Sequence, residues 1–270
     1  MKVMQMIMTK DNDFSCKKNE FLEFASMSVL GDRDRQEDCF GYIMDNQSLL
    51  LCVCDGMGGY NGGKMASEAA VKAILHDLNL RDMRSNPAEL LNELTIKANE
   101  EVYAIHHSNP DASSAGSTLV LIFVKDNLLY WNAVGDSRLY IWRKKQLIQS
   151  TTDQNYYTVL KEKWSAGKIS EEEYIQEQTH GDALVNYLGI GKLYLVDYNK
   201  EPLELKSGDQ LLVCTDGLYR ILSNEEIAVV LNKNADAKMT LQMMEFSVRK
   251  KSKEERKRRD NMTVSVIKVR

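Results

Sequence analysis

The segment SLLLCVCDGMGG, residues 48–59, joins an uninterrupted apolar run to one aspartate and a group of glycines. The run at 48–54 predicts a strand with both faces covered, because apolar side chains fall on each face. Asp55 and Gly56 predict a turn at its end, since Asp bonds locally and Gly tolerates positive φ. Residues 62–78 follow, with Ala, Leu and Ile at helical spacing. The segment therefore predicts a strand, a tight turn and a helix in direct succession.

Three further segments place an aspartate at the end or the start of a predicted strand. They are AVGDSR (133–138), VCTDGL (213–218) and RRDNMTV (258–264), with Asp136, Asp216 and Asp260 as the acidic residues. Taken singly, each aspartate is explained by a turn. Taken together, they put several carboxylates on one rim of the sheets if the strands lie side by side.

An acidic pair, Glu37 and Asp38, adds to this rim from the segment GDRDRQEDCF at 31–40. Carboxylates crowded together repel one another, so a fold retains them only with a counter-charge. A divalent cation is the natural counter-charge, and oxygen ligands favour Mg²⁺ or Mn²⁺ over zinc or copper. The pattern therefore predicts a metal site.

The order of the elements predicts an α+β fold. Strands are expected at 24–30, 48–54, 117–124, 127–134, 137–143, 146–150, 209–215 and 262–269. Helices are expected at 62–78, from Asn86-Pro87 to about His106, at 235–251, and after the capping-box pairs that begin at Ser170 and Ser223. This order lacks the regular alternation of a parallel sheet. We expect a four-layer α-β-β-α sandwich of two antiparallel sheets flanked by helices.

Composition narrows the function classes. The chain has 270 residues, of which 43% are hydrophobic, and this favours one domain over residues 21–270 after a loose tail at 1–20. A net charge of −4 argues against nucleic acid as a partner. No apolar stretch approaches the ~20 residues that cross a bilayer, and the N-terminal run is too short for a signal peptide. We therefore expect a cytoplasmic protein with no membrane partner.

The five cysteines are scattered and odd in number, so a disulfide framework is not expected. Cys52 and Cys54 are interpreted as buried free thiols on one strand face. Neither CxxC nor HExxH occurs, which argues against a zinc site.

The glycine-rich turn has an alternative interpretation. A strand, a glycine-rich turn and a helix can cradle a nucleotide phosphate. However, Asn61 stands where a GxGxxG motif needs its last glycine, and no P-loop motif occurs. Glycines that let the backbone approach an ion beside Asp55 explain the turn better. A nucleotide-binding protein remains as an alternative hypothesis.

Six motifs, taken in order, resemble the metal-dependent type 2C protein phosphatases, the PPM family, and especially its compact bacterial members. The motifs are RDRQED (33–38), DGMGG (55–59), AGSTLV (115–120), VGDSRLY (134–140), TDGL (215–218) and DNMTV (260–264). The resemblance covers about residues 24–269. It implies a β-sandwich flanked by helices, with a flap region at about 152–189.

The resemblance also implies a centre of two metal ions, Mn²⁺ or Mg²⁺. Asp55 would bridge both ions, and Asp216 and Asp260 would complete the shell of one. The Gly56 carbonyl, with Glu37 directly or through water, would serve the other. Two metal ions held in this way would acidify a water molecule, which would then act as the nucleophile.

Three more residues receive roles from the resemblance. Asp38 would support the metal shell, and Asp136 is similar to the residue that holds a third, weaker ion with the TDG aspartate in bacterial members. Arg33 would grip the substrate phosphate with its guanidinium fork. Outside the motif, a salt bridge from Arg33 to Asp32 or Asp34 would be the simpler interpretation.

The implied activity is hydrolysis of phosphoserine and phosphothreonine esters on proteins. The expected partners are phosphorylated proteins that a serine/threonine kinase has modified. An inactive pseudo-phosphatase that binds phosphoproteins is the alternative.

Four positions depart from the family pattern: Gln36 replaces an asparagine, Ser117 stands where threonine is usual, and Met57 and Gln154 also differ. Met57 stands where animal members carry a histidine, and Gln154 replaces the histidine of the TxDHS element. The basic run RKKSKEERKRR at 249–259 is interpreted as a solvated helix end, with a docking patch for acidic or phosphorylated partners as the second interpretation.

Overall fold

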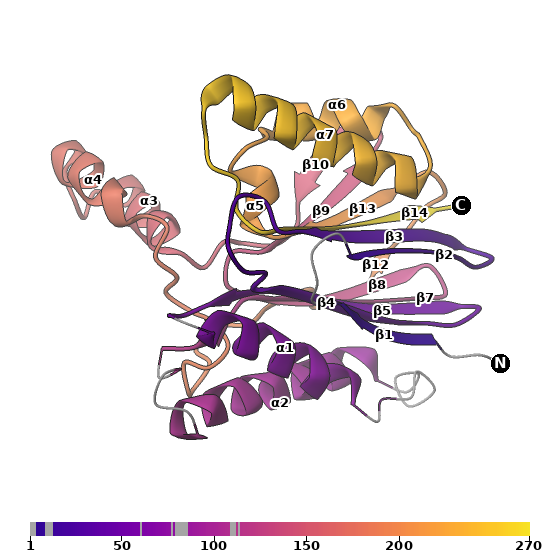
Figure 1. Ribbon diagram of the computed structural model, residues 1–270, viewed down its shortest axis with the longest axis horizontal. Coiled ribbons are helices and arrows are strands. Elements are labelled where there is room, and N and C mark those ends of the chain that lie inside the picture. The colour runs from indigo at the N-terminus through magenta and orange to yellow at the C-terminus, as the bar shows by residue number, and fades with distance from the viewer. Residues whose placement is uncertain are drawn as a thin grey trace.

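Two antiparallel sheets lie face to face, and helices cover the outer face of each (Figure 1). The computed structural model describes residues 4–8, 13–59, 61–76, 78, 86–108, 112 and 114–270. The helices α1 (Gly62–Leu75) and α2 (Pro87–Ser108) cover one sheet, and α6 (Asn224–Asn232) and α7 (Ala237–Glu255) cover the other. The expected four-layer α-β-β-α sandwich is confirmed.

The first sheet has the strand order β1-β4-β5-β7-β8-β11, with β12 also on β8 and the short β6 on β5. Its strands are β1 (Met4–Met8), β4 (Asp38–Met44), β5 (Ser48–Met57), β6 (Gly116–Ser117), β7 (Leu119–Lys125), β8 (Leu128–Val134), β11 (Asp197–Tyr198) and β12 (Leu203–Glu204). Residues Asp126 and Asn127 turn from β7 into β8 with φ of 50° and 61°. Two positive φ values give a turn whose twist matches that of the strands.

The second sheet has the order β10-β9-β13-β14-β3-β2. Its strands are β2 (Asp13–Lys18), β3 (Leu22–Val29), β9 (Arg138–Arg143), β10 (Gln146–Gln149), β13 (Gln210–Cys214) and β14 (Met262–Val269). The central strands β13 and β14 pair antiparallel, with Cys214 opposite Val264. The ends of these two strands that carry TDG and DNM therefore lie together.

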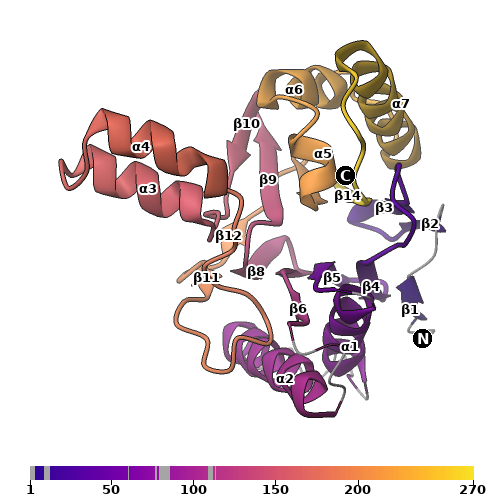
Figure 2. The same cartoon turned by 60° about the vertical axis from the view of Figure 1, so that its left-hand side comes forward.

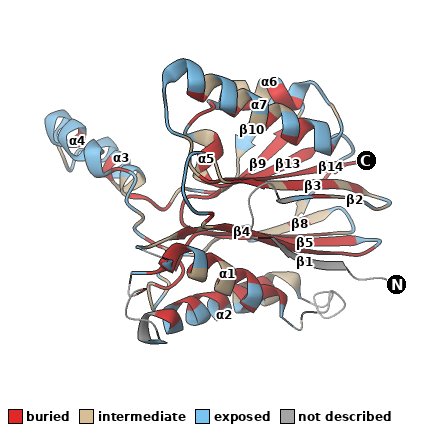
Figure 3. Ribbon diagram, viewed as in Figure 1, coloured by how far each residue is buried: buried red, intermediate tan, exposed pale blue. Residues whose placement is uncertain are grey.

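Strand β5 shows why its sequence is apolar throughout. Leu49, Leu51 and Val53 pack in the core between the two sheets, whereas Cys52 and Cys54 pack against α1 and α2. Both faces of the strand are thus covered, and burial is densest in these layers (Figure 3). Cys52 and Cys54 are free and buried, as expected.

A helical segment projects from the sandwich between β10 and β11 (Figure 2). It holds α3 (Tyr156–Ser165), α4 (Glu171–Glu177) and the 3₁₀ turn η3 (Gln178–His180). Ser170 forms the predicted capping box with Glu173. The Trp164 ring stacks on Tyr174 at a centroid distance of 4.9 Å, so the segment has a small aromatic cluster of its own.

Two expectations about the N-terminal half need correction. The loose tail expected at 1–20 instead contains β1, paired with β4, and β2, paired with β3. The hydroxyls of Ser15 and Tyr42 lie 2.6 Å apart and link β2 to β4. Strand β4 itself was not expected, because its apolar run follows directly on the charged segment 31–38. Of the helices in the described ranges, none has the length and apolar character of a membrane span.

Candidate metal centre

The acidic residues predicted to share a rim come from strand ends that the two sheets bring together. Asp38 begins β4 and lies opposite Asp55 on β5 in the antiparallel register. Asp216 follows β13 at the start of α5 (Asp216–Tyr219), and Asp260 precedes β14. Strand β5 continues to Met57, so Asp55 lies within the strand and not after it.

Glycines allow the motif backbones to touch. A Cβ on Gly56 would lie 2.0 Å from the Gly63 carbonyl oxygen and 2.6 Å from that of Glu37. A Cβ on Gly217 would lie 2.1 Å from the Asn261 carbonyl oxygen. Neither contact is compatible with a larger residue. The glycines beside Asp55 and Asp216 therefore set the spacing of the acidic rim.

Asp38 carries a carboxylate oxygen without a partner. Its Oδ2 accepts a hydrogen bond from the Thr215 hydroxyl at 2.9 Å, and its backbone amide donates to Gln36 Oε1 at 3.0 Å. Its Oδ1 is buried and, among the described residues, has no hydrogen-bond partner. Burial raises the pKa of Asp38 to about 7. A buried orphan oxygen beside a second carboxylate fits a cation.

Asp55 lies at the electrostatic centre of the rim. Desolvation raises its pKa well above the usual range, and the charges of Asp38, Asp216, Asp136 and Asp260 add to this effect in that order. Its backbone amide donates to the Thr118 hydroxyl at 2.9 Å. Four carboxylates thus lie close enough to disfavour ionisation of Asp55. Burial and the neighbouring carboxylates therefore leave Asp55 in need of a positive counter-charge.

Asp216 and Asp136 share one side of the rim. Burial raises the pKa of Asp216 to about 6, with Arg220 opposing the shift and Asp136 and Asp260 adding to it. Burial also raises the pKa of Asp136, again against Arg220. The Asp136 carbonyl accepts a hydrogen bond from the Tyr219 hydroxyl at 3.0 Å, which ties the VGDSR loop to α5.

Glu37 and Gly56 lie together on the other side. The Gly56 amide donates to the Glu37 carbonyl at 3.2 Å, and the Ser67 hydroxyl of α1 donates to the same oxygen at 2.5 Å. Burial raises the pKa of Glu37, while Arg33 and Arg35 oppose the shift. The predicted partners of the second ion are therefore neighbours.

Two arginines hold carboxylates of the rim. Arg33 Nη2 lies 2.5 Å from Asp260 Oδ2, and Arg220 Nε lies 2.7 Å from Asp216 Oδ2. Arg220 also reaches the flap, where its Nη1 lies 3.0 Å from Asp182 Oδ2. Within the described ranges, no three Asp, Glu, His or Cys side chains form a ready-made metal cage. The alternative for Arg33 was a salt bridge to Asp32 or Asp34, but its ion pair in the described residues is with Asp260, and Asp32 pairs with Arg259.

Sequence reasoning missed the polar residues that support the rim. Asn261 is the main one: its Oδ1 accepts from the Glu37 amide at 2.8 Å, and its Nδ2 donates to the carbonyls of Leu30 and Arg35, both at 2.9 Å. It thereby joins the RDRQED segment to the DNM segment. Only its position directly after Asp260 hinted at this role.

Gln154, which stands in place of the histidine of TxDHS, is a structural residue. Its Oε1 accepts from the Gly135 amide at 3.0 Å and from Asn186 Nδ2 at 2.6 Å. It therefore links the two ends of the flap to the loop that carries Asp136. The neighbouring Asp153 pairs with Arg138 at 2.6 Å, and its charge contributes to the raised pKa of Asp136.

The raised pKa values of these carboxyls predict that the metal-free protein becomes less stable as the pH rises from acidic to neutral values. Carboxyls whose pKa is raised on folding stabilise the fold most below their unfolded value near 3.8, and this stability is lost as the pH rises through about 6 and about 7. We expect the melting temperature in chelator to fall by about 5 °C between about pH 5 and about pH 8. Circular dichroism melts would measure it. Asp38→Asn should flatten the slope, and a melting temperature that rises over this range would contradict the assignment.

Comparisons with known proteins agree with this geometry. A sequence family described as Protein phosphatase 2C matches residues 30–257. A putative protein phosphatase of Mycoplasma genitalium is 26% identical over 254 residues, which cover 90% of this chain and 94% of that protein. The serine/threonine phosphatase stp of Listeria welshimeri is 30% identical over 205 residues, or 74% of this chain and 78% of that one.

A solved structure is similar over nearly the same range. It is the catalytic domain of the serine/threonine protein phosphatase PstP in complex with 2 manganese ions, with 26% identity and a TM-score of 0.72. The match covers 92% of this chain and 98% of that chain. The present chain belongs to the protein phosphatase 2C family, whose members are metal-dependent serine/threonine protein phosphatases.

Proposed function

We propose that this protein hydrolyses phosphoserine and phosphothreonine esters on phosphorylated proteins, with water as the nucleophile. The observation that carries the proposal is the group of buried carboxylates around Asp55, together with Asp38 Oδ1, which has no hydrogen-bond partner among the described residues. A rim of this kind has a large deficit of positive charge and only oxygen donors, which fits Mg²⁺ or Mn²⁺.

The proposed metal ligands fall into two groups that match the two sides of the rim. Asp55 would be shared by both ions, Asp216 and Asp260 would bind one of them, and Glu37 and the Gly56 carbonyl would bind the other. Asp38 supports the centre from β4, and Asp136 joins Asp216 at a third, weaker site. When bound, the ions supply a water acidified to hydroxide near neutral pH.

Arg33 is the proposed phosphate-binding residue. Its guanidinium is half exposed, and among the described residues it is held at its Nη2 by Asp260. A phosphate dianion can accept two parallel hydrogen bonds from the same guanidinium, which is a stronger interaction than the contact with Asp260. Arg33 would exchange the Asp260 carboxylate for the phosphate, which also leaves Asp260 able to act as a ligand. The substrates would be proteins that a serine/threonine kinase has phosphorylated.

The direct test is hydrolysis of a phosphothreonine peptide by the purified chain. We expect turnover with Mn²⁺ that is lost in chelator and recovered when Mn²⁺ is restored, because the carboxylates alone cannot activate water. Released phosphate would be measured, with a phosphoserine peptide in parallel. Tight peptide binding without turnover in Mn²⁺ would instead indicate the inactive, phosphoprotein-binding alternative.

A further inference from the structure

A cavity of about 380 Å³ opens beside the candidate metal centre. Its lining residues are Arg33, Asp34, Arg35, Glu37, Arg258 and Asn261. Three of these side chains are cationic, and Glu37 and Arg33 already have proposed roles at the ions and the scissile phosphate. Arg35 and Arg258 are therefore cations at the mouth of the site that the reaction itself does not use.

Arg258 forms no ion pair of its own: the carboxylate nearest to it in the described residues, that of Asp32, is paired with Arg259. The Nε and Nη2 of Arg258 both donate to the Asp32 carbonyl oxygen, at 3.0 and 2.8 Å. A carbonyl fixes the guanidinium in place but leaves its net charge, and among the described residues no hydrogen bond occupies its Nη1. Arg258 is exposed and is thus accessible to a ligand.

The backbone around both arginines is rigidly held. The Asp32 carboxylate accepts from Arg259 at 2.6 Å, and the Asp32 amide donates to the Arg259 carbonyl at 3.0 Å. Asn261 Nδ2 donates to the Arg35 carbonyl at 2.9 Å, and Arg35 Nη1 donates to Asn61 Oδ1 at 2.9 Å. The two cations are therefore positioned before any ligand arrives, which lowers the entropy cost of binding an anion.

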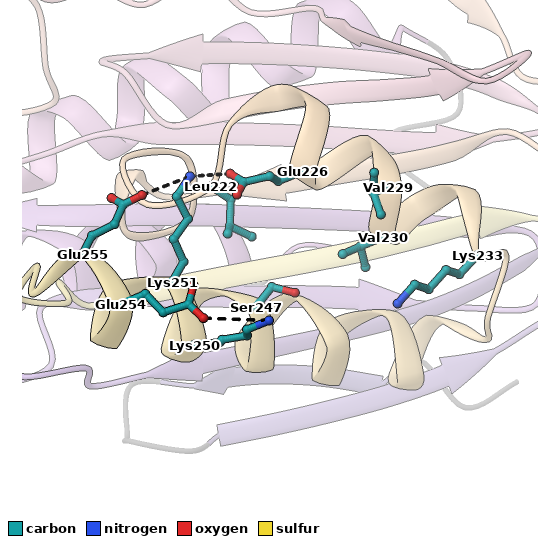
Figure 4. A pocket seen from close by; sticks show the side chains of 10 residues that line it. All are labelled: Leu222, Glu226, Val229, Val230, Lys233, Ser247, Lys250, Lys251, Glu254 and Glu255. Carbon is teal, nitrogen blue, oxygen red and sulfur yellow. Dashed lines mark hydrogen bonds and ion pairs between the residues drawn. The ribbon is translucent and has the colours of Figure 1, made fainter.

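A second groove shows what an internally neutralised site looks like in this chain. It lies between α6 and α7 (Figure 4), where Lys251 pairs with Glu226 at 2.5 Å and with Glu255 at 3.7 Å. Lys250 there faces Glu254 at 3.9 Å. Lys250 and Lys251 are thus paired with carboxylates of their own groove, whereas Arg258 lies in the cavity beside the candidate metal centre and, among the described residues, has no such pair.

We propose that Arg35 and Arg258 form a subsite for a second anionic group on the substrate polypeptide, close to the phosphorylated serine or threonine. The group is a carboxylate side chain or a second phosphate, since guanidinium forks pair with both. This inference rests on the proposed function and names its substrate class: phosphorylated segments with further negative charge nearby. Arg33 binds the phosphate that is hydrolysed, and the subsite favours substrates that carry a second negative charge near that phosphate.

The test compares kcat/KM for three series of phosphothreonine peptides. Each series carries alanine, glutamate or a non-hydrolysable phosphonate analogue of phosphothreonine, moved through the three positions on either side of the scissile residue. We expect at least one position at which the anionic peptides exceed the alanine peptide by about tenfold. Preference for glutamate, for the phosphonate or for both identifies the source of the charge. The advantage should shrink as salt is raised.

Variants then assign the preference to the two arginines. In the double variant Arg35→Gln with Arg258→Gln, the kcat/KM of the anionic peptide divided by that of the alanine peptide should fall to about one. If position 258 carries lysine instead of glutamine in that variant, part of the ratio should return, because lysine keeps the charge. Arg256→Gln, at the end of the same basic run and outside the cavity, should keep the full ratio. Melting temperatures would confirm that each variant is folded.

Two outcomes would overturn the inference. One is equal kcat/KM for all peptides in the unaltered protein, and the other is an unchanged ratio in the double variant. Fluorescence anisotropy of the same peptides provides a readout that does not require turnover. If no peptide is hydrolysed but the binding preference depends on Arg35 and Arg258, the proposed function fails while the subsite stands.

Discussion

Asp55→Asn is expected to lower phosphothreonine hydrolysis in Mn²⁺ by about a thousandfold or more, while the protein stays folded. The charges of four aspartates of the rim, Asp38, Asp216, Asp136 and Asp260, raise the pKa of Asp55, so it is the residue proposed as the ligand that the ions share. Asparagine keeps the shape and one oxygen but removes the charge. Initial rates with saturating peptide and Mn²⁺ would measure the loss.

A structural role would produce a different result. Because the charge of Asp55 is disfavoured in the metal-free protein, asparagine should leave its unfolding midpoint in urea unchanged or raise it. Asp126→Asn is the matched control: Asp126 is an exposed turn residue with φ of 50°, which asparagine also adopts. It should retain full activity. Wild-type rates from a folded Asp55→Asn protein would contradict the proposed role.

Arg33→Gln is expected to lower kcat/KM by about a hundredfold. The guanidinium faces a developing negative charge on the phosphoryl oxygens, and glutamine can donate only a neutral hydrogen bond. Arg33→Lys should recover part of the loss, since it restores the charge without the fork. Steady-state kinetics with a phosphothreonine peptide would resolve the change into kcat and KM.

The control for Arg33 is Arg249→Gln. Arg249 is an exposed arginine of α7 whose partner is Glu245, so the substitution removes the same group at a site remote from the rim. It should not change kcat/KM. If Arg33→Gln retained the full rate while binding Mn²⁺ normally, another cation would have to hold the substrate phosphate.

Short-range patterns predicted the main elements of the fold. The run before Asp55 is apolar because the two faces of β5 pack in two different hydrophobic cores, and Gly56 is required by its close backbone contacts with Gly63 and Glu37. The capping boxes at Ser170 and Ser223 begin helices as expected. Such features depend on neighbours within a few residues, so they are readable from the chain itself.

Long-range contacts could not be predicted in the same way. Thr215 supports Asp38 across 177 positions, and Asn261 supports Glu37 across 224. Nothing in either local sequence specifies its partner. The link from Arg220 to both Asp216 and Asp182 likewise depends on where the flap folds back. Edge strands β1 and β2 were missed because their stability comes from pairing with β4 and β3.

The central claim is that the acidic rim binds divalent ions through Asp55. Calorimetric titration of the metal-free protein with Mn²⁺ at neutral pH tests it without requiring a substrate. We predict two ions per chain in the unaltered protein, and a loss of tight binding in Asp55→Asn but not in Asp126→Asn. Binding of Mn²⁺ that is equal in all three proteins would contradict the account.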